Sequence, residues 1–182
     1  MSKRRGARAT KAEGPWWSGG LTFTCTSCGD CCRGPEPGFV EVDAPMITAL
    51  AEHVGLTEES FTRRYVRRLA NQAGMLSLIE KKNGDCVFWE DGQGCTVYEV
   101  RPTQCRTFPF WPEVLESKES WDEHAESCPG MTRAAEGQGR RYTSAQVETI
   151  LGGHGATGPS ALTSKAARGR RLARAGEQGG EA

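Results

Sequence analysis

The sequence predicts a small α+β domain with short helices, one hairpin and long loops rich in proline and glycine. The chain has 182 residues, of which 37% are hydrophobic, so it can bury one modest core but not a second sizeable one. Helical spacing of apolar residues is confined to short stretches, and Asn83-Gly84 separates two apolar runs as a tight hairpin turn does. Prolines at positions 102, 109 and 112 exclude long regular structure from that segment.

The first predicted elements follow residue 39. Residues 39–42 are expected to be a short extended piece, and a helix follows with Asp43 as its N-cap and Pro45 in its first turn. The apolar residues of this helix recur at helical intervals: Met46, Leu50 and Val54. We expect the helix to end near Gly55, where glycine favours a helix C-terminus.

A second helix is predicted to begin after Thr57, which serves as its N-cap. Glu58 and Glu59 lie in the first turn, where negative charge is favourable. One face of this helix is apolar and consists of Phe61, Tyr65 and Leu69. The opposite face is basic and consists of Arg63, Arg64, Arg67 and Arg68.

The later elements are shorter. The two apolar runs of "MLSLIEKKNGDCVFW" predict the hairpin, and residues 97–100 are expected to form one helical turn. Beyond residue 131, only "TSAQVETIL" has a helical pattern, which predicts a short helix over residues 144–151 capped by Ser144.

Charge is distributed unevenly along a chain whose net charge is zero. Residues 15–131 carry ten basic and eighteen acidic side chains, whereas residues 132–182 carry eight basic and four acidic ones. We therefore expect a flexible basic tail over 1–20, a folded domain over 21–131 and a mostly flexible tail over 132–182. The basic tails could contact nucleic acid, but no aromatic residues alternate with the C-terminal arginines to stack on bases, which favours solvated ends.

The sequence predicts a cytoplasmic protein. It has no apolar run of about 18 residues that could span a bilayer, and its basic start leads into "PWWSGG" instead of a signal peptide. In a reducing compartment cysteines serve as metal ligands or redox groups more often than as disulfides. A disulfide-linked secreted protein is the alternative.

The chain contains eight cysteines, and four of them lie in the stretch "CTSCGDCC" at residues 25–32. The other four lie in loop-like sequence: Cys86, Cys95, Cys105 and Cys128. Eight thiols make two sets of four, and four thiolates commonly hold either tetrahedral zinc or a 4Fe-4S cluster. We therefore expect bound metal to stabilise the irregular domain.

The spacing of the first cysteines favours an iron-sulfur cluster over zinc. Cys25, Cys28 and Cys31 have the C-x2-C-x2-C spacing typical of bacterial ferredoxin loops, whereas zinc sites more often use two separated C-x2-C pairs. Side chains of adjacent residues in extended chain point to opposite faces, so Cys31 and Cys32 are expected to serve different sites. Zinc stays the alternative metal.

Arginines and aromatic residues surround the cysteines in the sequence. Arg33, Arg101 and Arg106 lie close to predicted ligands and could donate hydrogen bonds to the thiolates; surface salt bridges are their alternative role. Four aromatic residues could shield the site from water or simply pack in the core: Trp89, Phe108, Phe110 and Trp111.

The whole pattern resembles the YkgJ-type cysteine-cluster family, also called CxxCxxCC, a zinc- or iron-chelating domain. The resemblance rests on "CTSCGDCC", "CVFWEDGQGCTVYEVRPTQCRTFPF" and "CPGM" and covers residues 21–131. It implies that all eight cysteines bind metal: Cys25, Cys28, Cys31, Cys32, Cys86, Cys95, Cys105 and Cys128. Flagellin lysine methylases contain a similar segment and are iron-sulfur proteins, which favours a cluster here.

The expected function is metal binding, with an iron-sulfur cluster in a redox or electron-transfer role and an unidentified protein or redox partner. Two alternatives stay open: an iron-sulfur enzyme of unknown substrate, and a zinc-held module that binds a protein or nucleic acid. No catalytic residues are assigned, because the sequence has no Ser-His-Asp order, P-loop or dinucleotide motif in a suitable context.

Overall fold

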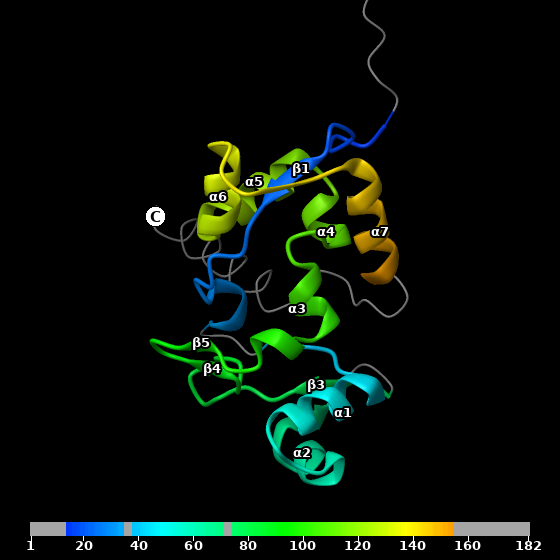
Figure 1. Cartoon of the computed structure of the whole chain (residues 1–182), viewed down its shortest axis with the longest axis vertical. Coiled ribbons are helices and arrows are strands. Elements are labelled where there is room, and N and C mark those ends of the chain that lie inside the picture. Colours follow the sequence, from blue (N-terminus) through cyan, green and yellow to red (C-terminus); the bar gives the residue numbers. More distant parts are fainter. Residues whose placement is uncertain (1–13, 35–37, 71–73, 155–182) are drawn as a thin grey trace, which may run out of the picture.

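A computed structural model describes residues 14–34, 38–70 and 74–154 of the chain. Within these residues it has short helices and three two-stranded antiparallel sheets, which is the α+β class that the sequence predicts (Figure 1). Most of the two predicted tails, residues 1–13 and 155–182, lies outside the described residues. No helix in the described part is both long enough and apolar enough to cross a bilayer.

Two helices begin where their caps predict. In α1 (Ala44–His53), Asp43 Oδ1 accepts a hydrogen bond from Met46 N at 2.9 Å, and in α2 (Glu58–Tyr65), Thr57 Oγ1 accepts one from Ser60 N at 3.2 Å. The two helices pack against each other, and Leu50 and Phe61 are both fully buried in the same core.

The second helix is shorter than its pattern predicts. After Tyr65 the chain turns into β2 (Val66–Arg68), which pairs antiparallel with β3 (Leu76–Leu78). Arg67 and Arg68 therefore lie on a strand, and the predicted basic helix face is wrong beyond Arg64. Strand pairing overrides the helical spacing here because the bonds to β3 satisfy the backbone groups of residues 66–68.

The Asn83-Gly84 turn is present, but its hairpin is small. Gly84 has a φ of +82° and Lys81 N donates to Asp85 O at 2.7 Å, while the arms share one antiparallel bridge, Glu80 to Cys86. Strand β3 pairs with β2 instead. A second tight hairpin follows, formed by β4 (Trp89–Glu90) and β5 (Gly94–Cys95).

The segment with three prolines forms short helices. It contains the 3-10 helix η2 (Tyr98–Val100), which is the predicted helical turn, and then α3 (Thr103–Thr107) and α4 (Pro112–Leu115). Pro102 is the N-cap of α3, and Pro112 is the first residue of α4, where its missing N–H costs nothing. The prolines therefore start helices here as well as limiting their length.

Several elements of the last third of the domain were not predicted. They are α5 (Lys118–Ser127), α6 (Pro129–Ala135) and β6 (Arg140–Tyr142), which pairs with β1 (Leu21–Phe23). The expected helix at 144–151 is α7 (Ser144–His154), and its cap is Thr143, not Ser144. Thr143 Oγ1 accepts from Gln146 N at 3.3 Å, and Gln146 Oε1 accepts from Thr143 N at 2.9 Å, which is a capping box.

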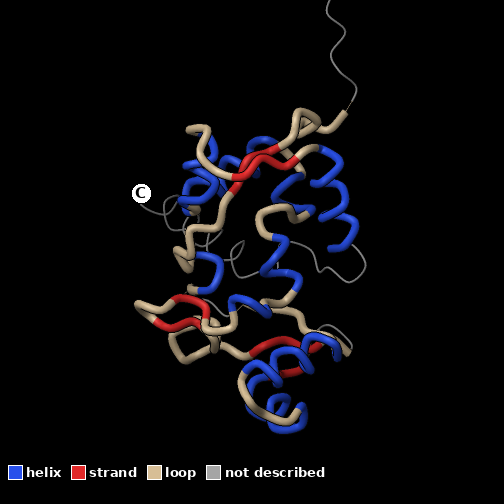
Figure 2. The backbone as a smooth tube through the Cα atoms, viewed as in Figure 1, coloured by secondary structure: helices blue, strands red, loops and turns tan. Residues whose placement is uncertain are grey.

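The buried side chains form two cores. Helices α1 and α2 lie toward one end of the long axis of the molecule, and helices α4 to α7 lie toward the other (Figures 1 and 2). What we call the central core comes from the middle of the chain: Val42, Ile47, Leu50, Ala51, Phe61, Leu78, Phe88 and Val97. The terminal core comes from both ends of the domain: Trp17, Leu21, Phe23, Phe108, Phe110, Trp111, Val114, Leu115, Trp121, Cys128, Met131 and Val147. The terminal core also includes residues before 21 and after 131, which lie outside the range predicted for the folded domain.

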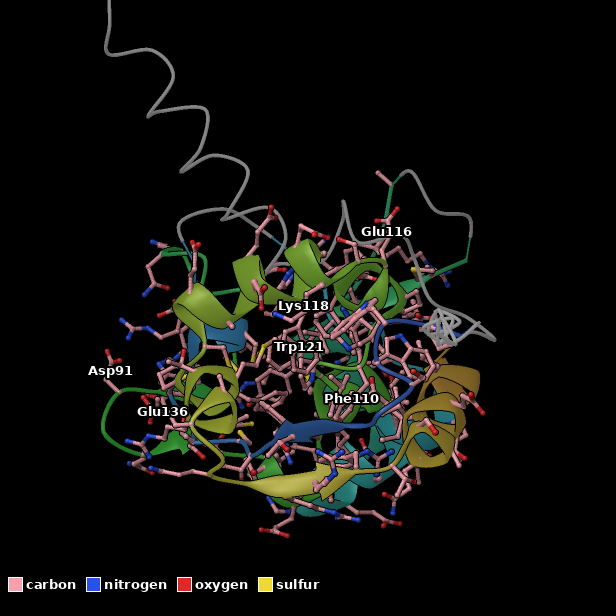
Figure 3. The ribbon with its side chains drawn as sticks, turned by 90° about the horizontal axis from the view of Figure 1, so that it is seen from above. Asp91, Phe110, Glu116, Lys118, Trp121 and Glu136 are labelled. Carbon is pink, nitrogen blue, oxygen red and sulfur yellow. The ribbon has the colours of Figure 1, made fainter. Side chains whose placement is uncertain are left out.

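The terminal core carries a charged exterior. Viewed from above, Phe110 and Trp121 lie toward the middle of the molecule, where both are buried (Figure 3). Glu116, Lys118 and Glu136 are exposed. Lys118 pairs with Asp122 one helical turn later. Helix α5 is thus anchored by a few apolar residues on an otherwise polar helix.

Candidate metal centre

The fold gathers cysteines from distant segments. Cys25 and Cys28 lie in the loop after β1, Cys31 and Cys32 in the 3-10 helix η1 (Asp30–Cys32), and none of the eight cysteines is in a disulfide. The later four lie in different elements: Cys86 before β4, Cys95 in β5, Cys105 in α3 and Cys128 between α5 and α6.

Seven of the eight cysteines line one cavity: Cys25, Cys28, Cys31, Cys32, Cys86, Cys95 and Cys105. The remaining wall is mostly apolar and comes from both cores, with Phe23 and Phe108 from the terminal core and Leu78, Phe88 and Val97 from the central core. The thiols therefore meet at the junction between the two cores.

Gly29 shapes the loop that carries the first cysteines. Its φ is +82°, which suits glycine, and its carbonyl accepts a hydrogen bond from Cys32 N at 2.8 Å. The Trp89 ring lies so close to its Cα that a Cβ at this position would overlap the ring. Arg33 lies over the same ring, 6.0 Å from its centroid. The loop thus fits against the β4 hairpin only because residue 29 has no side chain.

Backbone hydrogen bonds connect the first cysteine loop to the middle of the chain. Cys86 N donates to Cys32 O at 2.7 Å, and Trp89 N donates to Cys86 O at 2.9 Å. The buried carboxylate of Asp85 accepts from Gly34 N at 3.3 Å and from the Asn83 amide at 2.7 Å. Two loops far apart in sequence are thereby held together beside the cavity.

Cys128 reaches the first cysteine loop from the other side. It is 5% exposed, and the preceding Ser127 donates from Oγ to Asp30 Oδ2 at 3.0 Å. Two residues later, Gly130 packs directly against the carbonyl oxygen of Thr24, the residue before Cys25. These contacts place Cys128 next to the loop although it does not line the cavity.

Replacing Gly130 with alanine tests this close approach. Alanine is the better helix former by about 1 kcal/mol, and Gly130 lies in α6, so helix propensity alone predicts stabilisation. A Cβ at this position would overlap Thr24 O, which is backbone and cannot move freely. We expect a net loss of stability of about 1–3 kcal/mol, measured by denaturant unfolding. A more stable variant would contradict the contact.

The thiols influence one another electrostatically. A hydrogen bond with Cys32, together with burial, raises the pKa of Cys31 well above its usual value. Burial and then the neighbouring sulfurs of Cys32, Cys86 and Cys95 raise the pKa of Cys105. Thiols this close resist ionising together, and a bound cation removes that penalty, so the donor set fits a thiophilic metal or cluster.

Cys31 and Cys32 are closer than extended chain allows. Their Sγ atoms lie 3.8 Å apart, and both line the cavity, instead of pointing to opposite faces as expected. The reason is that both residues belong to the 3-10 turn η1, in which successive side chains differ by about 120°.

The three predicted arginines occupy different positions. Arg101 lines the cavity, and its guanidinium offsets a part of the rise in the pKa of Cys105 that burial and the neighbouring sulfurs cause. Arg33 lies at the rim, 4.0 Å from the carboxylates of both Asp85 and Asp91. Arg106 is exposed and donates to Thr103 Oγ1 at 3.3 Å, outside the cavity lining.

The four predicted aromatic residues also occupy different positions. Trp89 and Phe108 line the main cavity, Trp111 lines a smaller neighbouring cavity, and Phe110 packs in the terminal core. Tyr98 lines the main cavity too, and sequence reasoning missed it. Burial and then a hydrogen bond with the Cys25 side chain raise the pKa of Tyr98.

Arg101 and Tyr98 form one unit. The guanidinium carbon of Arg101 lies 3.5 Å from the centroid of the Tyr98 ring, and Arg101 Nε donates to Tyr98 O at 2.8 Å. The spacing of these two residues, Y-x-x-R between two cysteines, was the only sequence signal that could have identified the pair.

Comparison with known proteins assigns this centre to a family. Residues 24–129, which include all eight cysteines, match the family CxxCxxCC, described as "Putative zinc- or iron-chelating domain". The chain belongs to the CxxCxxCC family. Metal binding through the cysteine cluster is thereby supported, and the CxxCxxCC domain spans more than half of the chain.

One curated relative is an uncharacterized protein of Methanocaldococcus jannaschii, MJ0661, which is 28% identical over 100 residues. The match covers 54% of this chain and 50% of the relative, so the chain spans about half the length of that relative. No solved structure is significantly similar to the chain.

Proposed function

We propose that this CxxCxxCC domain holds an iron-sulfur cluster, most simply of the 4Fe-4S type, and that the domain serves a redox or electron-transfer role with a protein partner. The observation that carries the proposal is the cavity, in which thiols from four separate stretches of chain surround one largely apolar space. A low-polarity, cysteine-lined site at the junction of two cores is suited to a cluster whose potential depends on its surroundings.

The way in which the thiols are arranged favours a cluster over a single ion. The seven cavity cysteines surround a volume instead of converging on one point. A 4Fe-4S cluster fills a volume and takes one thiolate at each of its four corner irons, so four of these seven thiols would be enough to hold it.

The exposure of two ligand candidates supports the redox role. Cys25 and Cys28 are exposed at one end of the cavity, whereas Cys128 is buried. A cluster held partly by exposed cysteines lies near the surface, where a partner could exchange electrons with it.

Structural zinc is the second candidate, and one distance favours it. Tetrahedral zinc with Zn–S bonds of about 2.3 Å separates neighbouring sulfurs by about 3.8 Å. Cys31 Sγ and Cys32 Sγ are separated by 3.8 Å. In this case the metal would be redox-silent and would hold the two cores together.

The decisive experiment measures iron, zinc and acid-labile sulfide per chain, with a visible absorption spectrum, on protein purified without oxygen. Near-equal iron and sulfide with a broad charge-transfer band is the expected result, and zinc without sulfide would overturn the proposal in favour of the structural role. Ser27→Ala is the control variant, because it alters the same loop and keeps every thiol.

Tyr98→Phe tests the electronic role of the Arg101–Tyr98 unit. A hydrogen bond to a cluster sulfur stabilises the more negative reduced state, so we expect the variant to keep its iron and to have a lower reduction potential. The potential is measured by spectroscopic titration. Tyr142→Phe makes the same chemical change beside the terminal core, away from the cavity, and should leave the potential unaltered. Equal potentials in both variants would contradict the role of Tyr98.

A further inference from the structure

We propose that Gln104 is a positioning residue of the metal centre. Its side chain binds the backbone of residues 39–41 and its carbonyl binds Trp111, and these bonds hold the thiol of the next residue, Cys105, in the cavity wall. The proposal rests on the proposed function only in that Cys105 is a metal ligand, and it is the same for iron-sulfur and for zinc.

The side chain of Gln104 is polar, yet only 9% of the residue is exposed. Burying an amide is unfavourable unless hydrogen bonds satisfy it. Here both ends are bonded: Gln104 Oε1 accepts from Glu41 N at 3.0 Å, and Gln104 Nε2 donates to Phe39 O at 3.4 Å. One side chain thus satisfies a donor and an acceptor of the same short segment.

The segment that Gln104 binds is itself fixed to strand β3. Leu78 N donates to Val40 O at 2.9 Å, and Val42 N donates to Leu76 O at 3.1 Å. These bonds use the side of the segment that faces β3, and the bonds to Gln104 use its other side, because successive backbone groups of an extended chain point in opposite directions. Since β3 also pairs with β2, Gln104 binds a firm support beside the central core.

The main chain of Gln104 is bonded to the terminal core. Trp111 Nε1 donates to Gln104 O at 3.0 Å, and Thr107 Oγ1 donates to the same oxygen at 3.3 Å. Trp111 is 4% exposed and belongs to the terminal core. Gln104 therefore connects the two cores, with its side chain bonded on one side and its carbonyl on the other.

Cys105 follows Gln104 directly in α3. Both residues line the smaller cavity together with Phe39 and Trp111, and Cys105 also lines the main cavity. A helix of five residues is not stable alone, so the orientation of α3 depends on contacts of this kind. Rotation of α3 away from the main cavity would break the bonds of Gln104, which therefore keep the Cys105 thiol in place.

A residue that orients a ligand should affect metal affinity more than it affects folding. Loss of such a residue typically lowers metal affinity by about 10–100-fold. A residue with a purely structural role would destabilise the metal-loaded and the metal-free protein alike, and would leave the affinity unaltered.

The test replaces Gln104 with methionine, which has a similar length but forms neither side-chain bond. The full chain is purified with its metal, and bound metal per chain is measured against increasing concentrations of a competing chelator. We expect Gln104→Met to release its metal with an affinity about 10–100-fold lower than that of the wild type. Unaltered affinity would overturn the proposal.

Two further variants separate positioning from stability. Gln104→Glu keeps the acceptor for Glu41 N and should restore the affinity to within a few-fold of the wild type. Thr57→Ala removes the cap of α2, away from the cavity, and should lower stability to denaturant but not affinity. Equal losses of affinity in Gln104→Met and in either of these variants would contradict a positioning role.

Trp111→Phe carries the test if Gln104→Met does not fold. It removes the indole N–H that is bonded to Gln104 O and keeps an aromatic ring in the terminal core. We expect its metal affinity to fall several-fold, and unaltered affinity would overturn the proposal.

The metal analysis of the same samples separates this proposal from the proposed function. Zinc without sulfide, combined with the expected loss of affinity in Gln104→Met, would retain the role of Gln104 and overturn the iron-sulfur assignment. Iron and sulfide with unaltered affinity in that variant would do the reverse. A wild-type chain that holds no metal would overturn both.

Discussion

Replacing Gly29 with alanine is expected to destabilise the domain by about 2–5 kcal/mol and to abolish metal binding. Two costs add. A left-handed backbone costs a non-glycine residue about 1–2 kcal/mol, and Gly29 has a φ of +82°. The new methyl group would also overlap the Trp89 ring, which is 6% exposed and cannot easily move, and overpacking of this kind costs about 1–3 kcal/mol.

Gly92→Ala is the matched control for this variant. Gly92 has a φ of +81°, and no atom lies within 4 Å of the position that its Cβ would occupy. The control variant therefore has the cost of a non-glycine residue at positive φ, but its new methyl group overlaps no other atom. Both variants are compared by denaturant unfolding and by bound metal per chain. Equal losses in the two variants would mean that the contact between residue 29 and Trp89 does not hold the cysteine loop.

Removing the metal should have a comparably large effect. The cavity is lined by residues of both cores, so a metal centre bound there would join them, and its removal would leave the junction weakly packed. Structural zinc contributes about 10–16 kcal/mol to the folding of small domains, which is an upper bound here because both cores retain their own apolar contacts. We expect a lower Tm and a broader thermal transition after chelation.

Amide hydrogen exchange can locate this effect. After treatment with a strong chelator under reducing conditions, exchange should become faster at Cys86, whose N–H is bonded to Cys32 O beside the cavity. Val54 N, bonded to Leu50 O at the end of α1, should change much less. Uniform acceleration at both sites would indicate that the metal stabilises the whole domain, and an unaltered Tm would contradict its structural role.

Local sequence signals predicted those elements that local interactions determine. Asp43 and Thr57 cap their helices because a side-chain oxygen needs only the N–H three residues later. Gly84 turns the chain because it tolerates a positive φ. Each of these signals is complete within a few residues.

The elements that were missed depend on distant partners. Strand β1 pairs with β6, and neither three-residue strand has an alternating pattern long enough to be recognised. Helix α5 is mostly polar, with Trp121 and His124 as its buried residues, so it carries a weak apolar pattern. Arg67 and Arg68 continued a helical pattern but lie on a strand because β3 is available to pair with them.

The sequence predicted which cysteines form the candidate site, but not how they are arranged. Cysteine spacing identified the thiols, since few other roles require eight of them in such loops. It could not reveal that seven surround one cavity, that Arg106 points elsewhere, or that Tyr98 belongs to the site. Such positions depend on how η1, β5 and α3 pack, which no local pattern encodes.

The pairing of β1 with β6 sets an order for assembly during synthesis. The seven cysteines that line the cavity have all been made once residue 105 has been added to the chain. The loop that carries Cys25 follows β1, which finds its partner only when residues 140–142 emerge. The first cysteines in the chain are therefore among the last to reach their final positions, and until then they stay open to oxidants and to competing metals.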